Sequence, residues 1–293
     1  MDYFEELRKL NITFENYNEE EIGQIINSEY PFNRLMEFTT LFDKYRSSVK
    51  KGKFVSLDFD HLYSIAKIDE ELSKLIFCEF SEIERTLKAN LLALKDELDL
   101  PESVIEKYVQ TDKEYINKVY TPENRQVLVK YSKPIEELNF DQFLDVVQFG
   151  TFQRFNSYIY NTYKNCIFIY DDYVTSALKL RNKVAHCEAL LPQLSIKDGY
   201  GSQDVVAFLG RNGINHKTLT TNMSRTLLLD YCNMLYLYCL IEPMHKIKKN
   251  YDRLCAFIKY CESYAHIFSK NQTLSSVLNF MKSVVEIFGN KIT

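Results

Sequence analysis

The sequence predicts an all-α protein, and two observations support that prediction. Only 8 glycines and 6 prolines occur among 293 residues, which leaves little material for the tight turns of a many-stranded sheet. Long stretches are rich in leucine, lysine and glutamate, which are residue types that favour helices. We therefore expect a helical bundle with additional helices at its N- and C-terminal ends.

The first third of the chain holds the clearest helical pattern. Residues 19–27 and 32–47 are expected to be helices, and Lys50–Lys53 to be a turn after them. A long helix is then expected to open at Asp69, because apolar residues recur every three or four positions for about seven turns. Its apolar positions are Ile68, Leu72, Leu75, Ile76, Phe80, Ile83, Leu87, Leu91 and Leu94.

Shorter helices follow in the middle of the chain. Three prolines divide residues 96–138, and Asn139 is a suitable N-cap for the next helix, which Gly150 interrupts. A further helix is expected over residues 173–190. Two aspartates stand at its N-terminal end, where negative charge is favourable, and a proline follows it.

The last third begins with a glycine-rich segment. Residues 195–217 hold four of the 8 glycines, which predicts a long loop directly after the preceding helix, with a short hairpin at residues 205–209 as an option. Helices are expected over residues 219–249, bent at Pro243, and over residues 251–268.

This order of elements suggests three parts. Residues 1–60 form an N-terminal helical extension and residues 61–268 a helical core that includes the loop at 195–217. Residues 269–293 form a C-terminal helix.

Composition limits the classes of function. The net charge is −4 and the sequence pI is about 5.8. Proteins that coat nucleic acid non-specifically are usually basic, so a nucleic-acid substrate would meet a local basic site here.

The seven cysteines favour a reducing compartment. Their number is odd, and neither a C-x-x-C pair nor a histidine at zinc-ligand spacing accompanies them, so we expect free thiols, no metal site and no cofactor. The N-terminus lacks the pattern of a secretory signal, and the most apolar stretch, residues 227–241, is shorter than the ~20 residues that span a bilayer. We expect a cytoplasmic protein without a membrane partner.

One segment carries residue types suited to catalysis. Asn182 and His186 are four residues apart, which places them together on the edge of the expected helix, and Lys179 and Lys183 face outward beyond them. Arg181 falls within the apolar arc of the helix. A buried guanidinium needs a carboxylate or an anionic ligand as its partner.

These side chains fit the cleavage of RNA. An RNA chain carries its own nucleophile, the 2′-hydroxyl, so no metal-activated water is required. His186 can transfer a proton near neutral pH, and Arg181 can stabilise the negative charge that develops on the phosphate. Asn182 can orient the imidazole or the phosphate, and the two lysines can bind the substrate.

The same residues also permit two non-catalytic interpretations. Arg181 could pair with Glu84 or Glu188 while His186 lies on the surface, in which case the segment would be a module that binds RNA or a protein, or a structural scaffold. The remaining histidines, His61, His216, His245 and His266, are expected to be structural or on the surface. A cluster formed by Lys246, Lys248, Lys249 and Arg253 could guide an RNA backbone, but a solvated helix face is the better interpretation.

The stretch Ala177–His186, ALKLRNKVAH, resembles the R-N-x-x-A-H signature of HEPN domains in the form found in the Abi-like abortive-infection family (the AbiD/AbiF group). Two other segments resemble that family in the same order. They are Leu62-Tyr63 followed by Asp69, Leu72 and Ile83–Lys88, and the step Phe149-Gly150-Thr151.

This resemblance implies an all-helical HEPN fold, a homodimer and metal-independent ribonuclease activity in phage defence, or a toxin restrained by an RNA or protein antitoxin. The sequence departs from the family pattern after the motif, where Cys187 and Glu188 replace the usual second histidine and an arginine, and at Lys88, where arginine is common.

Overall fold

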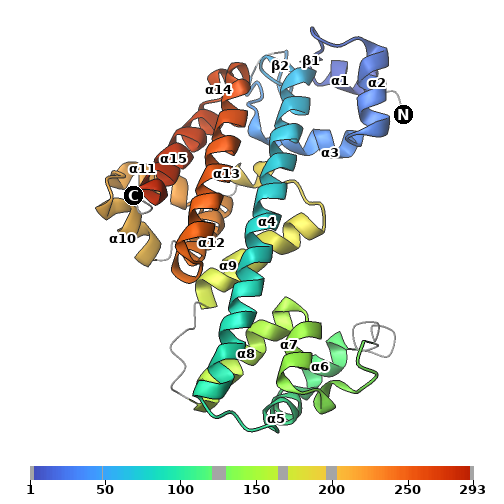
Figure 1. Ribbon diagram of the computed structural model, residues 1–293. Helices are drawn as coiled ribbons and strands as arrows, with labels where there is room; N and C mark the ends of the chain where they lie inside the picture. The colour runs from blue at the N-terminus through green and yellow to red at the C-terminus, as the bar shows by residue number, and fades with distance from the viewer. Residues whose placement is uncertain (1–2, 48, 121–129, 164–170, 196–202, 291–293) are drawn as a thin grey trace.

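A single helix, α4 (Phe59–Glu97), runs through most of the length of the molecule (Figure 1). Its 39 residues correspond to roughly 60 Å. The computed structural model describes residues 3–47, 49–120, 130–163, 171–195 and 203–290, and it confirms the all-α fold. Among these residues the only sheet is a two-stranded parallel pair, β1 (Ile12–Thr13) and β2 (Leu57–Asp58).

The start of α4 differs from the prediction. The helix begins ten residues before Asp69, because the buried stripe continues towards the N-terminus through Leu62 and Ile65. The side chain of Asp58 accepts a hydrogen bond from the N–H of Asp60 at 2.9 Å and so satisfies one of the free donors at the helix start.

The N-terminal elements pack around this end of α4. They are α1 (Tyr3–Lys9), α2 (Glu19–Ser28), α3 (Phe32–Glu37) and the 3₁₀ turn η1 (Phe38–Leu41). The helix expected over residues 32–47 therefore ends at Leu41. Its first part is fixed by the burial of Phe32, Leu35 and Phe38, whereas residues 42–47 contribute no further buried apolar side chain.

The opposite end of α4 carries a second group of helices. They are α5 (Val104–Thr111), α6 (Lys113–Val119), η3 (Ile135–Glu137), α7 (Phe140–Val146) and α8 (Phe149–Tyr163). Asn139 caps α7 as predicted, since its side chain accepts from the N–H of Gln142 at 2.9 Å. Gly150 lies inside the first turn of α8, so the predicted interruption falls before Phe149.

The middle of the molecule is built on α9 (Asp171–Ala185), which packs against both α4 and α12 (Thr226–Ile241). The elements α13 (Met244–Ser263), α14 (Ala265–Lys270) and α15 (Gln272–Gly289) complete this side. The bend expected at Pro243 is a complete break between α12 and α13. No helix of the described residues is long and apolar enough to cross a membrane.

The prediction of a long loop over residues 195–217 is wrong for most of that range. The 3₁₀ turn η4 (Leu191–Ser195) precedes it, and α10 (Gln203–Arg211) occupies the place of the predicted hairpin, followed by α11 from His216 to Met223. Val205, Phe208 and Leu209 are buried at helical spacing, and Gly213, with φ +106°, ends the helix. Two glycines of the expected loop, Gly199 and Gly201, lie outside the described residues, as does Cys166.

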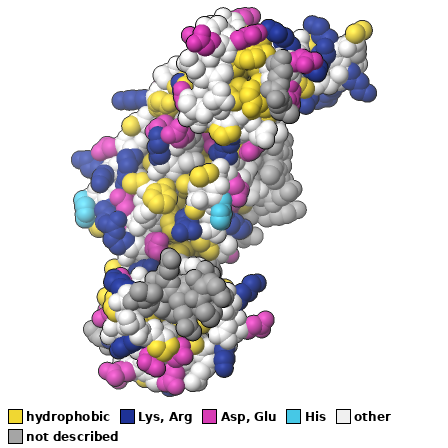
Figure 2. Space-filling view, turned by 90° about the vertical axis from the view of Figure 1, so that its right-hand side faces the viewer, with side chains coloured by type: hydrophobic (Ala, Val, Ile, Leu, Met, Phe, Trp, Pro, Cys, Tyr) yellow, Lys and Arg dark blue, Asp and Glu magenta, His cyan; other side chains and the backbone are white. Residues whose placement is uncertain are grey.

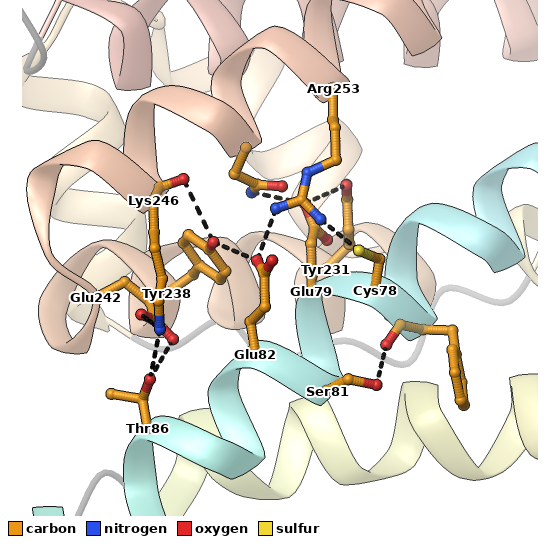
Figure 3. A network of polar contacts seen from close by, with 12 residues as sticks. Cys78, Glu79, Ser81, Glu82, Thr86, Tyr231, Tyr238, Glu242, Lys246 and Arg253 are labelled. Carbon is orange, nitrogen blue, oxygen red and sulfur yellow. Dashed lines mark hydrogen bonds and ion pairs between the residues drawn. The ribbon is translucent and has the colours of Figure 1, made fainter. Parts of the chain in front are cut away.

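A polar network joins α4 to α12 and α13 in the core (Figure 3). Glu79 is fully buried and accepts hydrogen bonds from Asn250 (2.8 Å) and from the hydroxyl of Tyr231 (3.4 Å). Arg253 lies beside it and forms an ion pair with Glu82 at 2.6 Å. Burial raises the pKa of Glu79 to about 8, although both hydrogen bonds and the Arg253 charge lower it.

This burial predicts a pH dependence of stability. Because the folded-state pKa of Glu79 is raised, folding favours the neutral carboxyl. The contribution of Glu79 to the free energy of unfolding is therefore fully present below the pKa of the unfolded chain and is lost as the pH rises through about 8. A Glu79→Gln protein stays neutral at all pH values and keeps the amide oxygen as an acceptor. The free energy of unfolding of Glu79→Gln, relative to that of the wild type, is expected to rise by a few kcal/mol when the pH is raised from 5 to 9, since one pKa unit corresponds to about 1.4 kcal/mol. Urea unfolding of both proteins at the two pH values measures this difference, and parallel pH profiles would contradict the assignment.

Candidate active site at the end of α9

The predicted motif lies at the C-terminal end of α9. The helix ends at Ala185, five residues earlier than expected, because Cys187 adopts a left-handed conformation with φ 53°. The N–H of Cys187 donates to the carbonyl of Val184 (3.0 Å) and that of Glu188 to Lys183 (2.9 Å), which is a Schellman-type helix end. Glycine usually occupies this position, so the sequence contained no clear signal for the helix end.

The two polar residues of the motif are open to solvent. Asn182 and His186 are exposed, and the backbone N–H of His186 donates to the carbonyl of Asn182 at 2.9 Å. The apolar arc is buried at Val174, Ala177 and Leu180, as the pattern predicted.

Arg181 is half-buried at the edge of this arc. Its Nη1 donates to Oδ1 of Asn182 at 3.2 Å, and its guanidinium lies 6.0 Å from the ring centre of Phe80 on α4. Asn182 therefore contacts Arg181 through its side chain and adjoins His186 one turn further along the helix.

The guanidinium of Arg181 is not neutralised by Glu84 or Glu188, the two partners that the sequence suggested. Glu84 pairs with Lys88 at 3.0 Å, and Glu188 is exposed. Within the part of the chain that the structure describes, no salt bridge joins Arg181 to either carboxylate. The positive charge therefore stays available to an anionic ligand.

The two lysines of the motif differ. Lys179 is exposed, as expected, but Lys183 is half-buried and donates to Oε1 of Gln193 in η4. Both lysines lie near Asp230, a buried carboxyl on α12. Burial raises the pKa of Asp230, while a hydrogen bond from Ser176 and the two lysine charges lower it. Lys183 thus contributes to the packing of α9 and does not simply face outward.

An open pocket of about 530 Å³ lies beside His186. One wall is the segment after α9, and the other comes from α3 and η1, which are more than 140 positions earlier in the sequence. The sequence pattern did not indicate the contribution of the N-terminal elements. The lining residues are Arg34, Glu37, Thr40, His186, Cys187, Glu188, Ala189, Pro192 and Gln193.

The other candidates from the sequence lie elsewhere. His61 is buried, its ring accepts a hydrogen bond from the N–H of Asp58 at 3.2 Å, and burial lowers its pKa. These contacts indicate a structural role. In the basic cluster of α13, Lys246 pairs with Glu242 (2.7 Å) and Arg253 with Glu82 (2.6 Å).

The charged surface agrees with a local site. On the face that Figure 2 shows, basic and acidic side chains are interspersed and form no continuous basic surface. Among the described residues, no group of three or more histidine, cysteine, aspartate or glutamate side chains is arranged to hold a metal ion.

Comparison with known proteins gives one informative result. A family model described as Abi-like protein matches residues 26–191, which is more than half of the chain. The matched region begins within α2 and ends in the first residue of η4, so it contains the residues that line the pocket beside His186 except Pro192 and Gln193. Comparisons with curated proteins and with solved structures return no match.

Proposed function

The chain belongs to the Abi-like protein family, and on that basis we propose that it is a metal-independent endoribonuclease of an abortive-infection or toxin-type phage defence system. The observation that supports this proposal most is that one helix end carries an exposed imidazole, His186, and a half-buried guanidinium, Arg181, that no carboxylate of the described chain neutralises. The family match supports a role in abortive infection, and the chemistry of the site supports RNA as the substrate.

The proposed reaction uses the substrate's own nucleophile. The 2′-oxygen attacks the adjacent phosphorus and loses its proton, and the bond from phosphorus to the 5′-oxygen breaks as that oxygen gains a proton. His186 transfers one of these protons, and Arg181 stabilises the charge on the non-bridging oxygens. The products are a 2′,3′-cyclic phosphate and a 5′-hydroxyl end.

A second copy of the chain would complete the site. One α9 helix supplies one imidazole, whereas the reaction needs one group to accept a proton and another to donate one. We therefore include in the proposal a HEPN-type arrangement in which two copies face each other across a two-fold axis at the exposed edge of α9. A cytoplasmic location and an RNA or protein antitoxin belong to the same proposal.

Cleavage of RNA without metal ions tests the proposed function. The purified protein is expected to cut total RNA in EDTA and to leave DNA of the same sequence intact, because DNA lacks the 2′-hydroxyl. Gel analysis before and after addition of EDTA gives the result. Activity that disappears in EDTA, or equal cutting of DNA, would contradict the proposal.

A non-catalytic binding module is the second candidate. It is favoured by Glu188, whose exposed carboxylate lines the same pocket as His186 and would repel a phosphate. This candidate predicts RNA or protein binding without turnover in the same assay.

A further inference from the structure

Backbone hydrogen bonds to α9 hold the segment that follows it as far as Glu188, since the N–H groups of His186, Cys187 and Glu188 donate to carbonyls of the helix. The chain then continues through Ala189 and reaches η4 at Leu191, so the course of this part of the pocket wall depends on how residues 189–191 are anchored. Anchoring from another element is therefore required if the pocket wall next to the imidazole is to keep a fixed place.

Asp69 on α4 provides this anchor. One carboxylate oxygen, Oδ1, accepts hydrogen bonds from two consecutive backbone groups, the N–H of Leu190 at 2.9 Å and the N–H of Leu191 at 2.6 Å. The residue is only 2% exposed, which separates it from its neighbours Glu70 and Glu71, whose carboxylates are exposed and pair with Lys74.

Arg34 holds the other side of the carboxylate. Its Nη2 lies 3.2 Å from Oδ2 of Asp69, and its Nη1 lies 3.7 Å from Glu37, which also lines the pocket. The turn η1 packs against η4 just beyond this pair. Burial raises the pKa of Asp69 to about 6, while the two backbone donors and Arg34 lower it.

A buried carboxylate at this position calls for an explanation beyond packing. Removing a charge from water costs free energy, and an apolar side chain would join the same helices without that cost. A carboxylate is the better choice only where backbone N–H groups need an acceptor in a fixed place. Here those groups belong to the fourth and fifth residues after His186.

We propose that Asp69 is a positioning residue for His186, and that Asp69 and Arg34 together hold residues 188–191 where they form the pocket wall beside the imidazole. This inference rests on the proposed function for its catalytic consequence. It also assigns a role in the site to α3, which lies in the predicted N-terminal extension.

Two variants of Asp69 and one matched control test the inference. Asp69→Ala removes the acceptor and is expected to lower kcat by about 10- to 100-fold with little change in KM, because small misplacements of a reacting group carry costs of this size. Asp69→Asn keeps an oxygen that can accept both N–H bonds but loses the charge that pairs with Arg34, so it is expected to recover part of the rate that Asp69→Ala loses. The control is Asp58→Ala, which removes another buried aspartate that accepts the backbone N–H groups of Glu15 and Asp60 but does not contact this segment.

Two measurements that do not need activity accompany the kinetics. In Asp69→Ala, the amides of Leu190 and Leu191 are expected to exchange hydrogen faster, and the imidazole NMR signals of His186, identified by their loss in His186→Ala, are expected to shift. Neither change is expected in Asp58→Ala.

Equal losses of kcat in Asp69→Ala and Asp58→Ala, or no rescue by Asp69→Asn, would overturn the inference. If the wild type cuts no RNA at all, the proposed function fails but the positioning role is still decided by exchange and NMR. Unchanged His186 signals in Asp69→Ala would then overturn it.

Discussion

Replacing His186 by alanine is expected to lower the rate of RNA cleavage by about 10²- to 10⁴-fold, the usual contribution of a general acid or base. The imidazole is exposed at the end of α9, so the variant is expected to keep its fold and its thermal stability. Initial rates on one labelled RNA, with circular dichroism of both proteins, measure the two effects separately.

The control for this experiment is another exposed histidine. His216 is the first residue of α11 and lies outside the pocket beside His186, so His216→Ala is expected to cleave at the wild-type rate. Full activity in the His186→Ala protein would exclude the proton-transfer role assigned to this residue.

Replacing Arg181 by alanine is expected to lower cleavage by about 10²- to 10³-fold, as is typical when one group that stabilises transition-state charge is removed. Arg181→Lys keeps a positive charge but loses the planar fork that matches phosphate oxygens, so it is expected to recover only part of the rate. The reduction should appear in kcat, since the interaction strengthens as charge builds on the phosphate.

Arg211 provides a matched control for the guanidinium. It is exposed on α10 and donates to its own helix at the carbonyl of Ala207, so Arg211→Ala is expected to leave cleavage unchanged. If Arg181→Ala and Arg211→Ala had the same small effect, RNA would be held by the general charge of the surface.

Much of the fold could be predicted because local patterns determine it. The apolar repeat of α4 and the Asn139 cap of α7 depend on residues close in sequence, and both were found in the structure. Residues 203–211 form a helix and not a loop because the spacing of the buried apolar residues outweighs the glycine count. Val205, Phe208 and Leu209 already had the spacing of a buried helix face, and Gly213 ends that helix.

The candidate site was predictable only where it depends on one helix. Helical geometry placed Asn182 and His186 on one edge, and both are exposed there. The contacts that shape the surroundings of His186 join residues far apart, such as Asp69 and Leu190, which are separated by 121 positions. A single sequence contains no local signal for such contacts, and for the same reason it does not indicate the pocket wall formed by α3 and η1.

The central claim is that the ribose hydroxyl of the substrate performs the attack, with His186 and Arg181 assisting. It is tested most directly with an RNA oligonucleotide cut at a mapped site and a second copy in which only the ribose on the 5′ side of the scissile phosphate is 2′-deoxy. We expect the deoxy substitution to abolish cleavage at that position while other sites in the strand are still cut, and mass spectrometry of the products of the all-ribose strand to show 2′,3′-cyclic phosphate ends. Unchanged cleavage at the deoxy position, with 3′-hydroxyl and 5′-phosphate ends, would contradict the claim.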